Sequence, residues 1–474
     1  MEAETKRLVK NTAIIGAGNI GIKAVQFLLL PLYTGLLTTE EYGKVDLFTT
    51  YGMLVALIFG LRLEQGVYRF LVDVRSDERK VSKLIGNILS IQLLAFVVFF
   101  LGGFAFGRVI ETEERVLFLL FCILNIFHTF SLQLPRGLGN YKTYAVAGMV
   151  NAASTVVSNV FFLVVMNLRA EGLIYGYIVG YLVTIIYIYS NTRIKFDMSS
   201  FIVDKNIILP VLKYSIPLIP SEISWYIIRS SDRYVIRFFL GTSAVGLLAV
   251  STKFSVILME IYSIFNVAWI DTTVVQDYER DSQVYISYVT NTAFKLFSCL
   301  MIVEMAVVGF GFDLLISANY IGAYRLIPFY IFSVGIYILI SLMSGILIAR
   351  KMVSDIASGA IISAVINLLF SIILVKRIGI LAAPISTCIA YVCMFAYFYN
   401  KISKIINIEI DWKYVIILVC VSIVIIALYQ FKSPLTSVCC VVIAIIFSSL
   451  VNKQVLKRMI SFLVNNFRRW KGEK

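Results

Sequence analysis

The stretch LIPFYIFSVGIYILISLMSGILI, residues 326–348, contains no charged side chain and decides the class of fold. At a rise of about 1.5 Å per residue, a helix of this length crosses the hydrocarbon core of a bilayer, which is roughly 30 Å thick. The whole chain of 474 residues shares this character, because 59% of its residues are hydrophobic and only 15% are charged. A soluble protein of this size needs more polar residues to cover its surface. The sequence therefore predicts an all-α membrane protein.

Apolar runs of similar length recur along the chain and predict about fourteen transmembrane helices. The expected spans cover residues 11–36, 42–66, 84–107, 116–135, 143–167, 173–192, 214–240, 243–269, 286–311, 326–348, 354–375, 379–400, 414–431 and 434–452. No predicted loop is long enough to hold a folded domain. An enzyme that needs a large external catalytic loop is therefore disfavoured.

Lys and Arg side chains collect in alternate loops. Arg75, Arg79, Lys80 and Lys83 precede the span 84–107, for example, and the C-terminal tail is also basic. By the positive-inside rule, both termini are expected in the cytoplasm and the chain is expected to cross the inner (cytoplasmic) membrane many times. The net charge of +14 then reflects loops that lie beside anionic lipid headgroups, and no nucleic-acid partner is expected.

A weak internal repeat divides the chain. A shift of 203 positions pairs Thr39 with Thr242 and Gly43 with Gly246 without a gap. We expect two pseudo-symmetric lobes of six helices, followed by two extra helices and a cytoplasmic basic tail. These parts cover residues 1–195, 196–405, 406–452 and 453–474. In transporters such a repeat interface holds the substrate near the bilayer midplane, although chance identity between apolar helices is an alternative explanation of the pairing.

Several ionisable and polar residues lie inside the predicted spans, where a charge costs at least about 2.5–3.5 kcal/mol and usually faces a cavity or a partner. In the first and seventh spans they recur every three or four residues, so that they share one helix face. The predicted cavity lining comprises Asn19, Lys23, Gln26, Arg62, Tyr226, Arg229, Arg233 and Lys253. The candidates for ion binding or charge pairing are Glu222, Asp232 and Glu260.

Basic side chains outnumber acidic ones in this set, which predicts an anionic guest. A pyrophosphate suits it, because Arg presents a planar fork to phosphate oxygens and Lys a mobile point charge. The alternative is that Glu222, Arg229, Asp232 and Arg233 pair with one another and only join helices.

Neither a cofactor nor a metal site is expected, since the seven cysteines show no metal-binding spacing. A proton or a sodium ion held by the acidic residues is the expected form of coupling. The single histidine, His128, is expected to make a hydrogen bond between helices, with proton relay as the alternative.

Three stretches carry a family resemblance: NTAIIGAGNIGIKAVQFLLLPLYTGLLTTEEYGKVDLFTT at 11–50, RGLGNYKTYA at 136–145, and KYSIPLIPSEISWYIIRSSDRYVIRFFLGTSAVGLLAVSTKF at 213–254. They resemble bacterial polysaccharide (oligosaccharide) flippases of the multidrug/oligosaccharidyl-lipid/polysaccharide exporter superfamily. One departure is the pair Leu247 and Leu248, where relatives often have an aromatic residue.

The resemblance implies a transporter rather than an enzyme, with two lobes around a central cavity. It implies that alternating access moves undecaprenyl-pyrophosphate-linked oligosaccharide from the cytoplasmic to the outer leaflet, for capsule, O-antigen, teichoic acid or a similar polymer. The expected partners are this lipid-linked substrate, membrane lipids, and the polysaccharide polymerase and chain-length machinery. Alternatives are a peptidoglycan lipid-precursor flippase, a multidrug exporter of the same superfamily, and a membrane glycan polymerase.

Overall fold

The computed structural model describes residues 27–105, 112–192, 194, 196–276, 282–406 and 408–451, and within these ranges all regular structure is helical. Eleven helices of this described part are long and apolar enough to cross a membrane, or twelve if the bent pair Thr39–Phe59 and Leu63–Val74 is counted as one span. The prediction of an all-α membrane protein is confirmed. The count of fourteen stays a prediction, because the first predicted span, 11–36, lies mostly outside the described residues.

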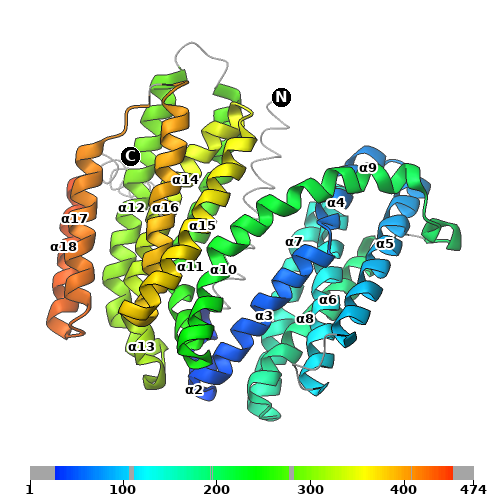
Figure 1. Cartoon of the computed structure of the whole chain (residues 1–474), viewed down its shortest axis with the longest axis horizontal. Helices are drawn as coiled ribbons and strands as arrows, with labels where there is room; N and C mark the ends of the chain where they lie inside the picture. The colour runs from blue at the N-terminus through cyan, green and yellow to red at the C-terminus, as the bar shows by residue number, and fades with distance from the viewer. Residues whose placement is uncertain are drawn as a thin grey trace, which may run out of the picture. The chain divides into compact units, whose positions relative to one another are not determined.

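The chain forms two compact units, residues 1–249 (unit 1) and 250–474 (unit 2). The lobe boundary predicted near residue 195 is a different division and stays a prediction. Unit 1 contains α2 (Leu30–Leu36), α3 (Thr39–Phe59), α4 (Leu63–Val74), α5 (Glu78–Ala105), α6 (Thr112–Gly137), α7 (Tyr141–Val160), the π-helix η1 (Phe161–Val165), α8 (Arg169–Thr192), the 3-10 turns η2 (Met198–Phe201) and η3 (Ile216–Leu218), α9 (Lys205–Ser215) and α10 (Ile219–Leu240). Figure 1 shows these elements in chain order.

A core of aliphatic side chains from α4, α5, α6 and α9 holds unit 1 together. Residues 205–213 were expected in a loop, and this expectation was wrong. Asp204 caps the N-terminus of α9 by accepting a hydrogen bond from the Asn206 N–H, and Ile208 and Val211 are buried in the core. This amphipathic pattern makes the segment helical, because the apolar stripe has a core to pack against. The 3-10 turn η3, which contains Pro217, then joins α9 to α10.

His128 of α6 makes a hydrogen bond to α7; these helices are the fourth and fifth predicted spans. Its Nε2 atom lies 3.0 Å from the side-chain nitrogen Nδ2 of Asn151. Its ring also stacks on Tyr181 of α8, with 4.6 Å between the ring centroids. The predicted hydrogen bond between helices is therefore confirmed.

The start of α11 (Thr242–Gln276) crosses α3 within unit 1. A Cβ atom on Gly43 would collide with the Thr242 carbonyl oxygen, and one on Gly246 would collide with the Thr39 carbonyl oxygen. These are the residues that the shift of 203 positions pairs, and their contact is reciprocal. Reciprocal contact between equivalent positions is typical of elements related by a two-fold axis. The crossing therefore supports the internal repeat.

Unit 2 contains the rest of α11, α12 (Ser282–Leu315), η4 (Ala318–Tyr320), α13 (Ile321–Tyr324), α14 (Ile327–Ala349), α15 (Val353–Ile378), η5 (Gly379–Leu381), α16 (Ala382–Ile402), α17 (Trp412–Tyr429) and α18 (Pro434–Val451). The stretch that decides the fold, 326–348, forms α14, which packs against α12 and α16. Helices α17 and α18 pack on α12, and α17 is tied to it at both ends. Lys295 Nζ lies 2.7 Å from Asp411 Oδ2 before α17, and Lys432 Nζ lies 2.7 Å from Asp313 Oδ1 after it.

Candidate functional site

The candidate site of unit 1 lies where α10 packs along α3 and where Arg62, at the start of α4, meets Glu222 of α10. Helix α3 ends at a break, and the pair α3 and α4 is bent by 51°. Leu61 and Arg62 form this break with left-handed backbone angles, φ 50° and 55°. Such angles are unfavourable for residues with a side chain and persist where surrounding contacts hold them. The break directs the Arg62 side chain towards α10.

Arg62 is held between two carboxylates. Its guanidinium lies 2.9 Å from Glu64 Oε1 on α4 and 3.2 Å from Glu222 Oε1 on α10. The side chains of Arg62 and Glu64 are only 19% and 15% exposed, whereas Glu222 is 35% exposed. We call these three residues the Arg62 cluster.

A second cluster also consists of one arginine and two carboxylates. Arg233 Nε donates a hydrogen bond of 2.6 Å to Asp46 Oδ2 on α3, and Arg233 Nη1 lies 3.5 Å from Asp232 Oδ1. Arg233 also donates a hydrogen bond of 2.9 Å to the Arg229 carbonyl oxygen. All three charged side chains are largely buried, Asp232 most of all. We call Arg233, Asp46 and Asp232 the Arg233 cluster.

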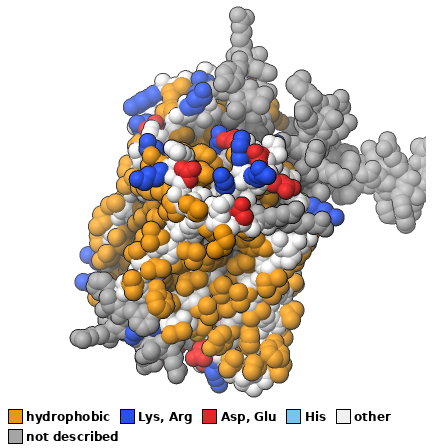
Figure 2. Space-filling model, turned by 90° about the vertical axis from the view of Figure 1, so that its right-hand side faces the viewer, with side chains coloured by type: hydrophobic (Ala, Val, Ile, Leu, Met, Phe, Trp, Pro, Cys, Tyr) orange, Lys and Arg blue, Asp and Glu red, His pale blue; other side chains and the backbone are white. Residues whose placement is uncertain are grey.

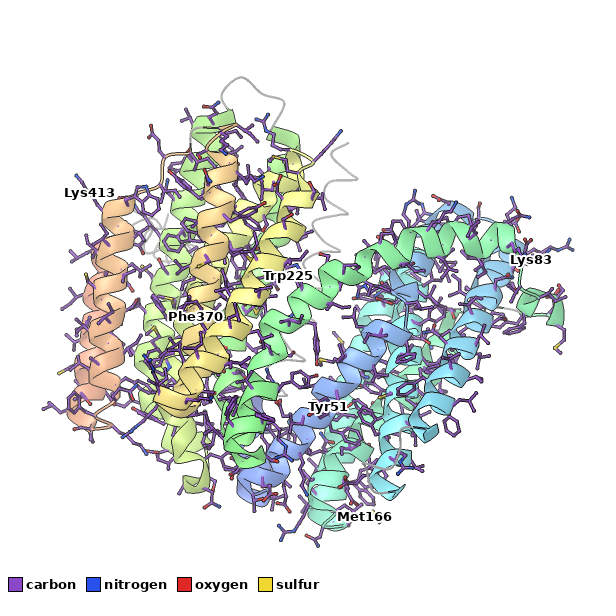
Figure 3. The ribbon with its side chains drawn as sticks, viewed as in Figure 1. Tyr51, Lys83, Met166, Trp225, Phe370 and Lys413 are labelled. Carbon is purple, nitrogen blue, oxygen red and sulfur yellow. The ribbon has the colours of Figure 1, made fainter. Side chains whose placement is uncertain are left out.

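Tyrosines separate the two clusters. The Tyr226 hydroxyl donates a hydrogen bond of 2.9 Å to the Thr50 carbonyl oxygen of α3 and also bonds to the Tyr234 hydroxyl. The Tyr234 ring packs against Tyr51 with 5.2 Å between their centroids. Figure 3 labels Tyr51 on α3 and Trp225 on α10, the two helices that carry the site. Tyr226 itself is buried, so it joins α10 to α3 while the ring of Tyr51 stays partly exposed.

The two clusters lie at separate levels of α10. Glu222 and Arg233 are eleven residues apart in one helix, which corresponds to about 16 Å at 1.5 Å per residue. Within the described contacts, each arginine meets two carboxylates. An ion pair within a span is favourable only when hydrogen bonds and further partners complete it. Removing one member of either cluster should therefore weaken the packing of α10 against its neighbours.

The structure places the predicted residues unevenly. It brings Arg62, Glu222, Tyr226, Asp232 and Arg233 together along one helix interface. Arg229 also lies on α10, is exposed, and makes no ion pair within the described part of the chain. Lys253 and Glu260 belong to the part of α11 in unit 2, and Asn19, Lys23 and Gln26 are outside the described residues.

The alternative weighed from the sequence was that Glu222, Arg229, Asp232 and Arg233 pair and join helices. Arg233 does pair with Asp232, but Glu222 pairs with Arg62, and Arg233 also pairs with Asp46 of α3. The assignment of the whole set to a substrate cavity stays a prediction.

Sequence reasoning missed Asp46 as a site residue. It is an acidic residue inside the predicted span 42–66, which is the signal that singled out the other charged residues. Tyr51 and Tyr234 carried no comparable signal, because aromatic residues are common throughout the chain. Only the packing of α10 on α3 identifies them.

Known proteins resemble the chain in sequence and in fold. A family model described as "Polysaccharide biosynthesis protein" matches residues 8–270, more than half of the chain. The solved structure of the lipid II flippase MurJ, in an inward closed conformation, has a TM-score of 0.67 at 13% identity and covers 94% of this chain and 100% of that chain. An inward-facing multidrug resistance MATE family transporter of the MOP superfamily has a TM-score of 0.59 at 15% identity, covering 81% of this chain and 95% of that chain.

A Vibrio cholerae MATE transporter has a TM-score of 0.57 at 15% identity and covers 86% of this chain and 99% of that chain. At these identities the structural matches show a shared fold. No curated protein matches the chain.

Proposed function

The chain belongs to the polysaccharide biosynthesis protein family, and we propose that it is a transporter that flips lipid-linked oligosaccharide across the inner membrane. The observation that carries the proposal is the column of charged and tyrosine side chains between α3 and α10, inside the span of a chain from this family. The substrate we propose is an oligosaccharide joined to undecaprenyl pyrophosphate, which moves from the cytoplasmic to the outer leaflet by alternating access.

The proposed recognition of the pyrophosphate uses arginine forks. Arg229 is exposed on α10 and is the guanidinium best placed to meet a phosphate oxygen first. Glu222 is the most exposed member of the Arg62 cluster, so a phosphate that replaces this carboxylate would gain a bidentate contact with Arg62. Lys23 remains a candidate for the same role from the first span.

The carboxylates that contact the two arginines support coupling to a cation. A proton or a sodium ion bound at Glu222 or Asp232 would weaken the hold of that carboxylate on its arginine, and release of the cation would restore the ion pair. Glu260 in unit 2 is a further candidate. Collapsing the ion gradients should then slow flipping; an unchanged rate would exclude this coupling.

The test of the proposed function compares two arginines of α10. Arg229→Ala should reduce exported polymer at least tenfold and leave lipid-linked oligosaccharide on the cytoplasmic side, with the protein still in the membrane. Arg237→Ala is the matched control, because Arg237 is also exposed and lies at the end of the same helix. Normal export in Arg229→Ala and Lys23→Ala variants would reject the proposed cavity.

A second candidate is an exporter of organic cations. The observation that favours it is the presence of two carboxylates in each cluster, since a cationic guest needs acidic partners. A deletion strain distinguishes the two functions. Accumulated lipid-linked oligosaccharide supports the flippase, whereas increased sensitivity to cationic drugs with normal polymer supports the exporter.

A further inference from the structure

The linker between α8 and α9 runs beside α5 and exposes unusually apolar side chains. Residues 197–204, DMSSFIVD, form the 3-10 turn η2 and the chain that leads to α9. We call this segment the strap. Met198 is 89% exposed and Ile202 is 69% exposed, and Phe201 and Val203 are exposed as well. Single exposed apolar residues are common, but four within six consecutive residues require a partner that is itself apolar.

The strap is fixed to α5 by hydrogen bonds. Ser82 bonds to the Ser200 hydroxyl at 2.7 Å, and Ser90 donates to the Phe201 carbonyl oxygen at 2.8 Å. The Asn87 side chain makes two hydrogen bonds to the strap. Its amide nitrogen donates to the Ser200 carbonyl oxygen, and its amide oxygen accepts from the Asp204 N–H. A Cβ atom at Gly86 would collide with the Ser200 backbone, so glycine allows this close approach.

These contacts matter because α5 is a membrane span. The candidate span runs from Glu78 to Gly102, and Ser82, Asn87 and Ser90 lie in its first half. Irregular backbone is tolerated at such a depth only where its polar groups are satisfied by protein. The bonds from α5 satisfy the carbonyl groups of Ser200 and Phe201 and the Asp204 N–H, and the Asp197 side chain accepts from the Ser200 N–H. The strap also covers Ser82 and Asn87 of α5, which are buried.

The surroundings of the strap match an anionic lipid surface. Figure 2 shows a face of the molecule with apolar side chains over much of its height and charged side chains gathered towards one end. Lys83, labelled in Figure 3, is exposed next to Ser82, and Lys205 is exposed directly after the strap. Farther along α5, Leu94 is 60% exposed and continues the apolar surface. Apolar side chains with basic residues beside them are typical of segments that lie in a membrane interface.

We propose that the strap is a lipid-binding segment that buries Met198, Ile202 and Val203 at the boundary between headgroups and acyl chains of an anionic leaflet, with Lys83 and Lys205 among the headgroups. This role does not depend on the transported substrate. It anchors the connection between α8 and α10 to the leaflet on the side where the sequence places the basic loops.

Spin labels in nanodiscs test the depth of the strap. Met198→Cys and Ile202→Cys variants of the full chain are labelled in a background without the seven native cysteines, whose unfolding temperature is first matched to that of the native protein. Leu94→Cys is the lipid-facing control, and Lys80→Cys, at an exposed ion pair, is the water-facing control. Strap labels should be several-fold more accessible to oxygen than to a water-soluble nickel chelate, as at Leu94. Strap labels that are as accessible to the nickel chelate as the label at Lys80→Cys would overturn the proposal.

Lipid composition tests the charge preference. Discs with phosphatidylglycerol should hold the strap labels deeper than discs of phosphatidylcholine alone, and the double variant Lys83→Gln/Lys205→Gln should remove this difference. Equal depth in both lipids would overturn the preference for an anionic leaflet. Labels that face water in nanodiscs but are protected in native membranes would overturn lipid binding altogether and indicate a protein partner.

Discussion

The two units use ion pairs differently. Three ion pairs of unit 2 each join one Lys to one Asp, and at least one partner of each pair lies at or just beyond a helix end. Lys295–Asp411 and Lys432–Asp313 hold the two ends of α17, and Lys401 Nζ lies 2.7 Å from Asp355 Oδ1, where α16 ends and α15 begins. In unit 1 the Arg62 and Arg233 clusters lie along the helices, and each brings one arginine into contact with two carboxylates.

This difference predicts different energies for the two kinds of ion pair. A single ion pair near water contributes about 0–1 kcal/mol. A largely buried three-membered cluster costs more desolvation energy, and loss of one member leaves a charge buried without that partner. A role of the two unit 1 clusters in binding a substrate or an ion stays a proposal.

The largest expected effect comes from removing Arg233. Arg233→Ala leaves Asp46 and Asp232 facing each other, and loss of one partner from a buried ion pair typically costs about 3–5 kcal/mol. We expect a sharp fall in the unfolding temperature in detergent and in the yield of folded protein. The double variant Arg233→Ala/Asp46→Asn should recover part of this loss.

The control for this experiment lies in unit 2. Lys401→Ala removes a cation that is 37% exposed and should change the unfolding temperature little. An equal fall in unfolding temperature for Arg233→Ala and Lys401→Ala would contradict the distinction between the two units, because the two kinds of ion pair would then be energetically equivalent.

The reciprocal crossing of α3 and α11 should give the next largest effect. Gly43→Ala and Gly246→Ala each force a Cβ atom against the backbone of the other helix. Overpacking of this kind typically costs about 1–3 kcal/mol, so both variants should unfold at lower temperature and to a similar extent. Gly35→Ala is the control, since nothing lies within 4 Å of the added atom. A loss in only one of the two variants would argue against an equivalent role of the repeated glycines.

Sequence reasoning captured the membrane fold because lipid imposes it on each span separately. The run 326–348 needs no neighbour to be identified, and it forms α14 within a residue or two of its predicted ends. The break at Leu61 and Arg62 was not predicted, because neither residue is a proline or a glycine and the span 42–66 reads as one continuous helix. Its left-handed backbone depends on the contacts that Arg62 makes with Glu64 and Glu222.

The site was predictable only in part, because some of its residues are brought together by packing between helices. Periodicity identified the α10 face that carries Glu222, Tyr226 and Arg233, since it is a property of one helix. The acidic partner Asp46 and the aromatic partner Tyr51 come from α3 and are chosen by packing between helices. The sequence alone therefore identified Arg233 but not the α3 carboxylate that it contacts.

The smallest expected effect concerns the ends of α17. A hydrogen bond from Lys295 holds the pKa of Asp411 below its usual range, assisted by the Tyr414 N–H at the helix start. Because the folded pKa is lower than the unfolded one, the pair stabilises the protein above the usual carboxyl pKa of about 4, and this contribution is lost as the pH falls through the folded pKa. Asp411 is 40% exposed, so solvent screening keeps the effect within about 1 kcal/mol.

Asp411→Asn should therefore lower the unfolding temperature slightly at pH 7, and the difference from the native protein should shrink as the pH falls below about 4. Thermal unfolding in detergent across this range measures both quantities. The Arg233 cluster provides the contrast. Asp46→Asn removes a partner from a largely buried ion pair, so it should lower the unfolding temperature far more than Asp411→Asn does. If the two substitutions had equal effects, depth in the membrane would not distinguish the charges of unit 1 from those of unit 2.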